Sequence, residues 1–178
     1  MFAQQIHGSK RSIRSVEDFT EFEQRTAYFN GDPIRGMKKG LNLIDRLLVA
    51  HMGQMQSMID FPPAPKLDSS GRLDKRKASP QEIRGEALFF GKARCVECHS
   101  PPAYTNHNMH DLQLERFGAE ADGPIKSFAL RGIKDSPPYL HDGRLPTLED
   151  TVEFFNLVLE LKLNQEEKKE LAAFMRAL

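Results

Sequence analysis

The sequence predicts an all-α protein, and three observations support this. Two segments in the first sixty residues carry apolar side chains at helical spacing. Three segments after residue 78 begin with residues that cap helix N-termini. No segment alternates convincingly between apolar and polar residues, which is the pattern of a half-buried strand. We therefore expect helices joined by irregular loops.

Residues 1–65 are expected to form an N-terminal helical extension. A first helix is predicted over residues 16–28, and the turn-forming residues 30–33 end it. A second helix is predicted over residues 38–59, with one apolar stripe that gives it a face to bury. The stripe consists of Leu41, Ile44, Leu47, Leu48, His51, Met55 and Met58. Residues 66–78 are charged and show little periodicity, so they are predicted to be a solvated linker.

Residues 79–178 are expected to form one domain with helices near both of its ends. The first helix starts at Ser79, which is a suitable N-cap, and Glu82 completes a capping box. Two later helices are predicted to start at Thr147 and Asn164, because each is followed three residues later by an acidic residue. Gly85 and Gly91 permit close approach to the Ser79 helix. The last helix has a buried edge, so we expect these two helices to cross each other.

The segment Cys95-Val96-Glu97-Cys98-His99 is the most informative motif of the chain. Cys-x-x-Cys-His is the attachment signature of a covalent c-type haem. The two thiols add to the two porphyrin vinyl groups, and the adjoining imidazole ligates the iron from the proximal side. The alternative is a dithiol redox pair or half a zinc site, but the chain contains only these two cysteines. The motif therefore predicts a cytochrome c-like domain with one haem.

Composition excludes several classes of function. Lys and Arg together number 25, as do Asp and Glu, so net charge implies neither a nucleic acid nor a membrane surface as partner. No apolar run is long enough to cross a bilayer. The first fourteen residues do not form a secretory leader. Haem attachment to such motifs usually takes place outside the bacterial cytoplasm. We therefore expect a periplasmic location and a chain that is part of a longer precursor.

From about Ser79 to its end the chain resembles the C-terminal haem domain of bacterial di-haem cytochrome c peroxidases. The motifs that carry the resemblance are Arg84-Gly85-Glu86-Ala87-Leu88-Phe89 before the haem motif, Tyr104-Thr105-Asn106-His107-Asn108-Met109-His110-Asp111, Leu130-Arg131-Gly132, Pro138-Tyr139-Leu140-His141-Asp142-Gly143-Arg144 and Thr147-Leu148-Glu149-Asp150. Family members normally hold a peroxidatic haem in an N-terminal domain and an electron-accepting haem in a C-terminal domain. Only the second kind of motif is present here, and the chain contains no Trp of the kind that relatives often place between the haems.

The resemblance implies a role in electron transfer. In the full-length protein this domain would accept electrons from a small donor protein, of the cytochrome c or cupredoxin type. It would pass them to a second haem domain that reduces hydrogen peroxide. The alternative is a mono-haem module with an open iron site that itself acts as a peroxidase or as a haem-based sensor.

The sixth iron ligand separates these two readings. In the family it is a Met or Tyr on the helix after the His-Asp-Gly turn, and the matching position here is Phe155, which cannot coordinate iron. Met109, His110 and His141 remain as alternatives. A further set of alternatives lies on the second predicted helix, namely His51, Met52, Met55 and Met58.

Other residues are candidates for contact with the haem periphery. Arg131 and Arg144 suit the propionates, because guanidinium groups match carboxylates. Tyr139 is a candidate for contact with the iron or a propionate, although a buried Tyr more often bonds to backbone. The resemblance also implies a calcium site at the interface between the haems, with backbone oxygens near Ser136 and Pro138.

Overall fold

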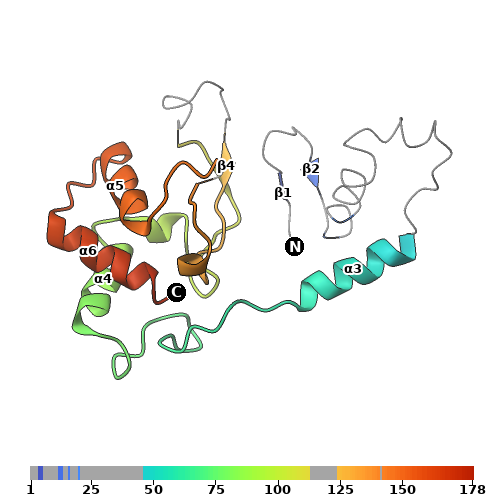
Figure 1. Cartoon of the computed structure of the whole chain (residues 1–178), viewed down its shortest axis with the longest axis horizontal. Coiled ribbons are helices and arrows are strands. Elements are labelled where there is room, and N and C mark those ends of the chain that lie inside the picture. The colour runs from blue at the N-terminus through green and yellow to red at the C-terminus, as the bar shows by residue number, and fades with distance from the viewer. Residues whose placement is uncertain are drawn as a thin grey trace. The chain divides into compact units, whose positions relative to one another are not determined.

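The computed structural model describes residues 4–5, 12–13, 16, 20, 46–112, 124–140 and 142–178. The chain divides into two compact units, Met1–Asp60 and Phe61–Leu178 (Figure 1). The described part of the chain is mostly helical, with two very short strand pairs, and this confirms the all-α prediction. The domain boundaries expected at residues 65 and 78 stay predictions.

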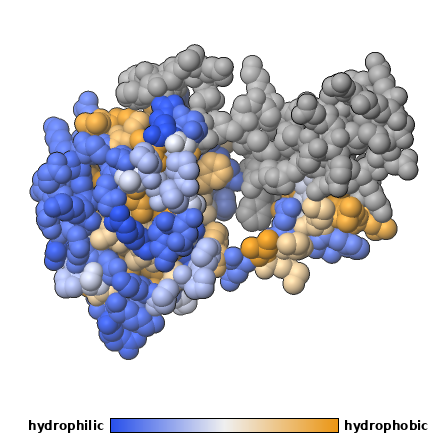
Figure 2. Space-filling model, viewed as in Figure 1, coloured by the Kyte–Doolittle hydropathy of each residue, from blue (hydrophilic) through white to orange (hydrophobic). Residues whose placement is uncertain are grey.

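The first unit contains one short strand pair and one described helix. Strand β1 (Gln4–Gln5) pairs antiparallel with β2 (Ser12–Ile13). Helix α3 (Arg46–Met58) lies within the second predicted helix, and residues 21–45 lie outside the described residues. The expected apolar stripe is not buried in the described part of α3, because its members from Leu47 onward are exposed (Figure 2). The buried positions on this helix are Val49 and Gly53.

Three α-helices are found in the described part of the second unit, and each begins with a capping box. They are α4 (Pro80–Phe90), α5 (Leu148–Val158) and α6 (Gln165–Met175), with N-caps Ser79, Thr147 and Asn164. In each case the N-cap side chain accepts from the backbone N–H three residues later, and the acidic side chain there accepts from the N-cap N–H. The predicted helix starts are confirmed because these contacts are local and follow directly from the spacing.

Helix α4 packs closely against α6, as the sequence predicted (Figure 1). The closest approach lies at Gly85, where an added Cβ would come within 1.9 Å of the Glu170 carbonyl oxygen. The Arg84 guanidinium forms an ion pair with the Glu170 carboxylate beside this contact. Lys92 binds Glu167 at 2.7 Å further along the same helix pair. A residue without a side chain at position 85 therefore sets the distance between the two helices.

Three aromatic rings fill the space next to the crossing. Phe89 of α4 and Phe174 of α6 lie 5.2 Å apart between ring centroids, in an edge-to-face arrangement. Tyr104 completes the cluster, at 5.6 Å from the Phe89 ring and 6.1 Å from the Phe174 ring. All three side chains are fully buried. The Tyr104 hydroxyl donates to the Gly71 carbonyl, so this ring also connects residues 66–78 to the core.

Residues 66–78, expected to form a solvated linker, are part of the second unit and contribute a buried side chain to it. Leu73 is buried, and its N–H donates to the Glu86 carboxylate at 2.9 Å. The Arg72 Nε also donates to Glu86 at 2.9 Å, and its guanidinium lies 3.8 Å from the Phe90 ring centroid. Glu86 is itself buried, so these two donors compensate a carboxylate that would be costly to bury alone.

The loop between the haem motif and α5 contains the remaining elements. Strand β3 (Met109–His110) pairs antiparallel with β4 (Ile125–Lys126), so that Met109 faces Lys126 and His110 faces Ile125. A short 3-10 helix, η3 (Ile133–Asp135), follows. These segments and η1 (Cys95–Glu97) bring the haem motif, the β3–β4 pair and α5 around one cavity.

We predict that Gly85→Ala destabilises the protein by about 2 kcal/mol, because the overlap with backbone at Glu170 outweighs the better helix propensity of Ala. Urea unfolding followed by far-UV circular dichroism would measure this. The matched control is Ala87→Ser on the exposed side of α4, for which a change within about 0.5 kcal/mol is expected. Equal stability of Gly85→Ala and the parent protein would show that the helices do not cross at Gly85.

Candidate haem-binding site

The haem motif forms a tight turn at the C-terminal end of α4. Arg94 adopts a left-handed conformation with φ of 55°, and the η1 turn follows. The backbone N–H groups of Cys98 and His99 both donate to the Cys95 carbonyl, at 3.3 and 2.9 Å. The turn therefore holds the two cysteines and the histidine in a fixed relation to one another.

His99 is oriented by a hydrogen bond from its own ring. Its Nδ1 lies 3.0 Å from the Tyr104 carbonyl oxygen, and because a carbonyl only accepts, Nδ1 carries the proton. Nε2 is then left with a lone pair, as an iron ligand requires. Burial lowers the pKa of His99, and backbone hydrogen bonds with Tyr104 and Phe128 only partly oppose this shift, so the net effect favours the neutral imidazole.

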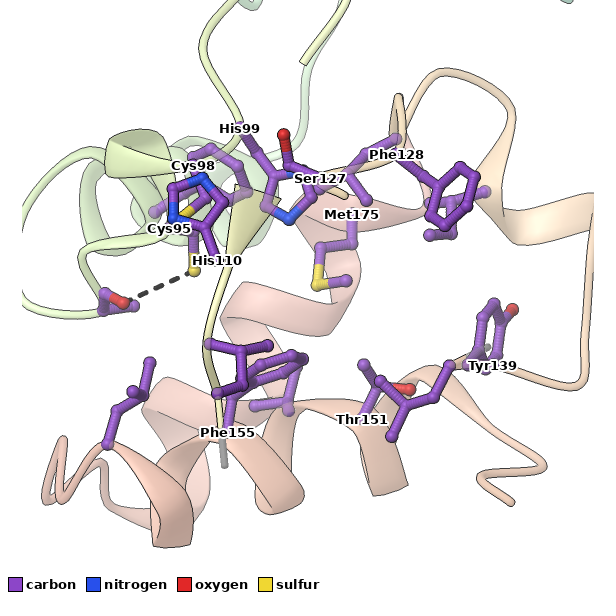
Figure 3. Close-up of a pocket in the computed structure, with 18 of the residues that line it drawn as sticks. Cys95, Cys98, His99, His110, Ser127, Phe128, Tyr139, Thr151, Phe155 and Met175 are labelled. Carbon is purple, nitrogen blue, oxygen red and sulfur yellow. Dashed lines mark hydrogen bonds between the residues drawn. The ribbon is translucent and has the colours of Figure 1, made fainter. Parts of the chain in front are cut away.

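A cavity of about 550 Å³ lies beside this motif, within the usual size range for cofactor sites. Its walls come from the haem motif, residues 125–130, residues 136–140, α5 and the C-terminal half of α6. Cys95, Cys98 and His99 all line it. Figure 3 shows these three side chains together on one side of the cavity, with Thr151 and Phe155 of α5 across from them.

The chemistry of the two thiols fits a covalent haem. Burial raises the pKa of Cys95 to about 12, and burial also raises the pKa of Cys98. Both side chains are therefore neutral thiols, and no second cysteine pair or group of three metal-ligating His, Cys, Asp or Glu side chains occurs among the described residues. A mainly apolar cavity with two thiols and an oriented imidazole on its wall suits a porphyrin better than a metal ion.

Phe155 lies on the cavity wall, as its sequence position suggested. Its ring packs edge-to-face on Phe154, with 5.5 Å between centroids. Around it the wall of α5 contributes Thr151 and Val152, and Leu161 follows the helix. The Thr151 hydroxyl donates to the Thr147 carbonyl at 3.0 Å. This wall therefore presents apolar groups to the cavity at the position where relatives were expected to supply a ligand.

The other proposed iron ligands lie in several places. His110 lines the cavity next to the haem motif, with Nδ1 3.4 Å from Cys98 Sγ. Met109 is 37% exposed and is not one of the lining residues. His141 lies outside the described residues. The four candidates on α3 belong to the first unit.

Two arginines were expected at the propionates. Arg131 donates to the carbonyls of Leu178 at 3.1 Å and Pro62 at 3.0 Å, and it is not one of the lining residues. Arg144 forms an ion pair with Asp142, while its Nη1 is buried without a hydrogen-bond partner among the described residues. Arg144 thus retains a free donor at Nη1, but it does not line the cavity either, and only two of the five N–H groups of Arg131 make these bonds. The expected propionate contacts of both residues stay predictions.

Tyr139 and the residues expected near calcium lie in one segment of the cavity wall. The Tyr139 ring lines the cavity, and its backbone N–H donates to Leu145 at 2.7 Å. Burial raises the pKa of Tyr139, so its hydroxyl stays protonated. Ser136 and Pro138 line the same wall. The expected haem contact of Tyr139 and the calcium site stay predictions.

The sequence analysis missed several lining residues, and two of them bear on haem chemistry. Met175, at the end of α6, is buried and points its thioether into the cavity in Figure 3. Its position four residues after Leu171, on the buried edge of α6, was the available signal. Lys126 is 8% exposed and lines the cavity, and burial lowers its pKa. Its place in a two-residue strand is not evident from local pattern.

No protein-family model matches the chain. Among curated proteins it is similar to a cytochrome c551 peroxidase of Nitrosomonas europaea, with 30% identity over 76% of this chain and 44% of the relative. It is also similar to the methylamine utilization protein MauG of Methylorubrum extorquens, with 30% identity over 53% of this chain and 33% of the relative. A cytochrome-c peroxidase IdrP1 of Pseudomonas sp. strain SCT is 27% identical, over 59% of this chain and 41% of the relative. The chain therefore spans less than half the length of these relatives.

Solved structures show the same fold. A MauG-like protein associated with microbial copper homeostasis superimposes with a TM-score of 0.67 and 19% identity, over 89% of this chain and 65% of that chain. The hydrazine synthase of Kuenenia stuttgartiensis gives a TM-score of 0.55 with 21% identity, over 90% of this chain and 61% of that chain. No helix in the described ranges is long and apolar enough to cross a membrane. These relatives show that the chain is homologous to part of the bacterial di-haem cytochrome c peroxidases and MauG proteins.

Proposed function

We propose that this chain binds one covalent c-type haem and is the electron-relay part of a larger di-haem oxidoreductase. The observation that carries the proposal is the orientation of His99, whose Nδ1 is engaged by Tyr104 while its ring lines a cavity next to two thiols. Cys95 and Cys98 would form the thioether bonds, and His99 would hold the iron through Nε2. A bound haem iron changes between ferric and ferrous states and so supplies one-electron transfer.

The surrounding residues support a redox role. The core packed behind the motif fixes His99 through Tyr104, so that little reorganisation would accompany a change of charge. Arg144, with its unpaired Nη1, would compensate a propionate. The apolar walls of α5 and α6 would exclude water from the cavity.

The length of the relatives supports a partner domain. Because the chain spans less than half of each of the three curated relatives, we propose that a second haem domain of the same full-length protein accepts the electrons and reduces hydrogen peroxide. A small cytochrome c or cupredoxin would be the donor. We further propose a periplasmic location, since haem attachment takes place there.

The first test is haem attachment itself. After expression with haem-maturation machinery, the protein is expected to be coloured and to carry the mass of one haem that denaturation does not remove. The single substitutions Cys95→Ala and Cys98→Ala should each leave one thioether bond. Peptide mass spectrometry would detect that bond as haem attached to the remaining cysteine. Two free thiols and no colour in the parent protein would contradict the proposal.

A relay haem has two protein ligands, so we expect a low-spin ferric signal in electron paramagnetic resonance and optical spectra. Met175 is the only methionine among the described lining residues, and its thioether is a suitable soft ligand. Met175→Leu, a nearly volume-conserving change, is therefore expected to convert the signal to high spin. Met109→Leu, outside the cavity lining, serves as the control and should leave the signal low-spin. A low-spin signal that survives Met175→Leu would exclude Met175 as the ligand.

Phe155 favours a second candidate function, in which the iron site is open and itself meets a peroxide or a gaseous ligand. This candidate predicts a high-spin parent protein. Phe155→Tyr adds a phenolic oxygen on the cavity wall and should then produce a new six-coordinate spectrum, with Phe154→Tyr as the neighbouring control. A low-spin parent whose spectrum is unchanged by Phe155→Tyr would eliminate the open-site function.

A further inference from the structure

The two cysteines of the motif have different surroundings. Cys95 Sγ lies 3.5 Å from the Ala93 carbonyl oxygen, a backbone group of its own turn. Cys98 Sγ instead lies 3.4 Å from Nδ1 of His110, a side chain twelve residues away. Figure 3 shows the His110 ring beside Cys98 at the cavity wall. Only the second thiol therefore has an imidazole partner among the described residues.

The orientation of His110 follows from Asn106. The Asn106 side chain donates through Nδ2 to the Glu97 carbonyl at 2.9 Å, and its Oδ1 accepts from the Asn108 N–H at 2.9 Å and the Ser127 hydroxyl at 2.7 Å. These partners settle which end of the amide is oxygen. His110 Nε2 lies 3.2 Å from this same Oδ1. Because Oδ1 only accepts, Nε2 carries the proton.

The tautomer of His110 then determines the direction of its contact with sulfur. In a neutral imidazole with its proton on Nε2, Nδ1 carries a lone pair. The Cys98 S–H therefore donates to His110 Nδ1. Asn106 is in turn anchored to the haem motif, since its own N–H donates to the Cys98 carbonyl at 2.9 Å. The imidazole and the thiol are thus held by the same short segment of backbone.

We propose that His110 is a positioning residue for the thioether bond at Cys98. Its lone pair holds the Cys98 sulfur at the cavity wall while the haem is attached. In that addition the S–H bond and the π bond of a vinyl group break, a C–S bond forms, and the hydrogen ends on the other vinyl carbon. No electrons are gained or lost. The inference rests on the proposed haem function, and it assigns His110 to the sulfur rather than to the iron, because both ring nitrogens are already in use.

The test measures each thioether bond separately. Parent protein, His110→Leu, His110→Gln and the control His107→Asn would be expressed with haem-maturation machinery. Free thiols would be alkylated under denaturing conditions and located by peptide mass spectrometry. His107 is an exposed neighbour with φ of 58°, which Asn tolerates. In His110→Leu the ratio of free to linked Cys98 should rise by roughly three- to tenfold, with Cys95 still linked.

The remaining arms separate this role from a merely structural one. His110→Gln keeps polar atoms near the sulfur and should restore part of the Cys98 linkage, and the ferric spin state should match the parent in every variant. Equal linkage of Cys98 in the parent, His110→Leu and His110→Gln would overturn the inference. Simultaneous loss of both linkages in the two His110 variants would also overturn it, because it would show that His110 is needed for the fold as a whole. A change from low spin to high spin in these variants would overturn it as well, because it would make His110 an iron ligand. Free thiols at both positions in the parent would refute the proposed haem function, and the inference with it.

Discussion

The contact between α4 and α6 at Gly85 is the constraint on which the rest of the second unit depends. Because position 85 has no side chain, the helices approach until the Gly85 Cα meets the backbone of Glu170. This approach brings Phe89 and Phe174 into ring contact, and Tyr104 packs on both. The Tyr104 carbonyl then accepts from His99 Nδ1. A backbone contact between helices distant in sequence thus sets the tautomer and direction of the histidine expected to bind iron.

The core is built around a cavity rather than filled completely. A cavity of about 550 Å³ bordered by buried side chains of α5 and α6 forfeits much packing stabilisation in the isolated chain. A bound cofactor would restore those contacts, and it would stabilise the folded state by an amount that depends on its affinity. Covalent attachment would keep the cofactor, and therefore these contacts, in place. Stability and haem binding are therefore expected to be coupled in this protein.

Charged groups near the cavity are distributed unevenly. Most ion pairs of the second unit, such as Lys92 with Glu167 and Arg94 with Glu97, lie at its surface and contribute little stability. Lys126 is different, because it is buried on the cavity wall and forms no ion pair with an acidic side chain among the described residues. The Arg144 Nη1 is also buried without a hydrogen-bond partner in the described part of the chain, but Arg144 does not line the cavity. A buried lysine on the wall of an apolar cavity suits a cofactor that brings its own carboxylates.

The sequence by itself determined the local features of this protein. Capping boxes and the Cys-x-x-Cys-His turn depend on residues three or four apart, so their spacing was enough to predict helix starts, the haem motif and the all-α class. Tertiary structure decided which distant groups meet. It places Met175 on the cavity wall and His110 against Cys98. It also lets Arg131 donate to the Leu178 and Pro62 carbonyls, and it leaves the apolar stripe of α3 exposed. These partnerships depend on how helices and loops pack, and residue spacing carries no direct record of that packing.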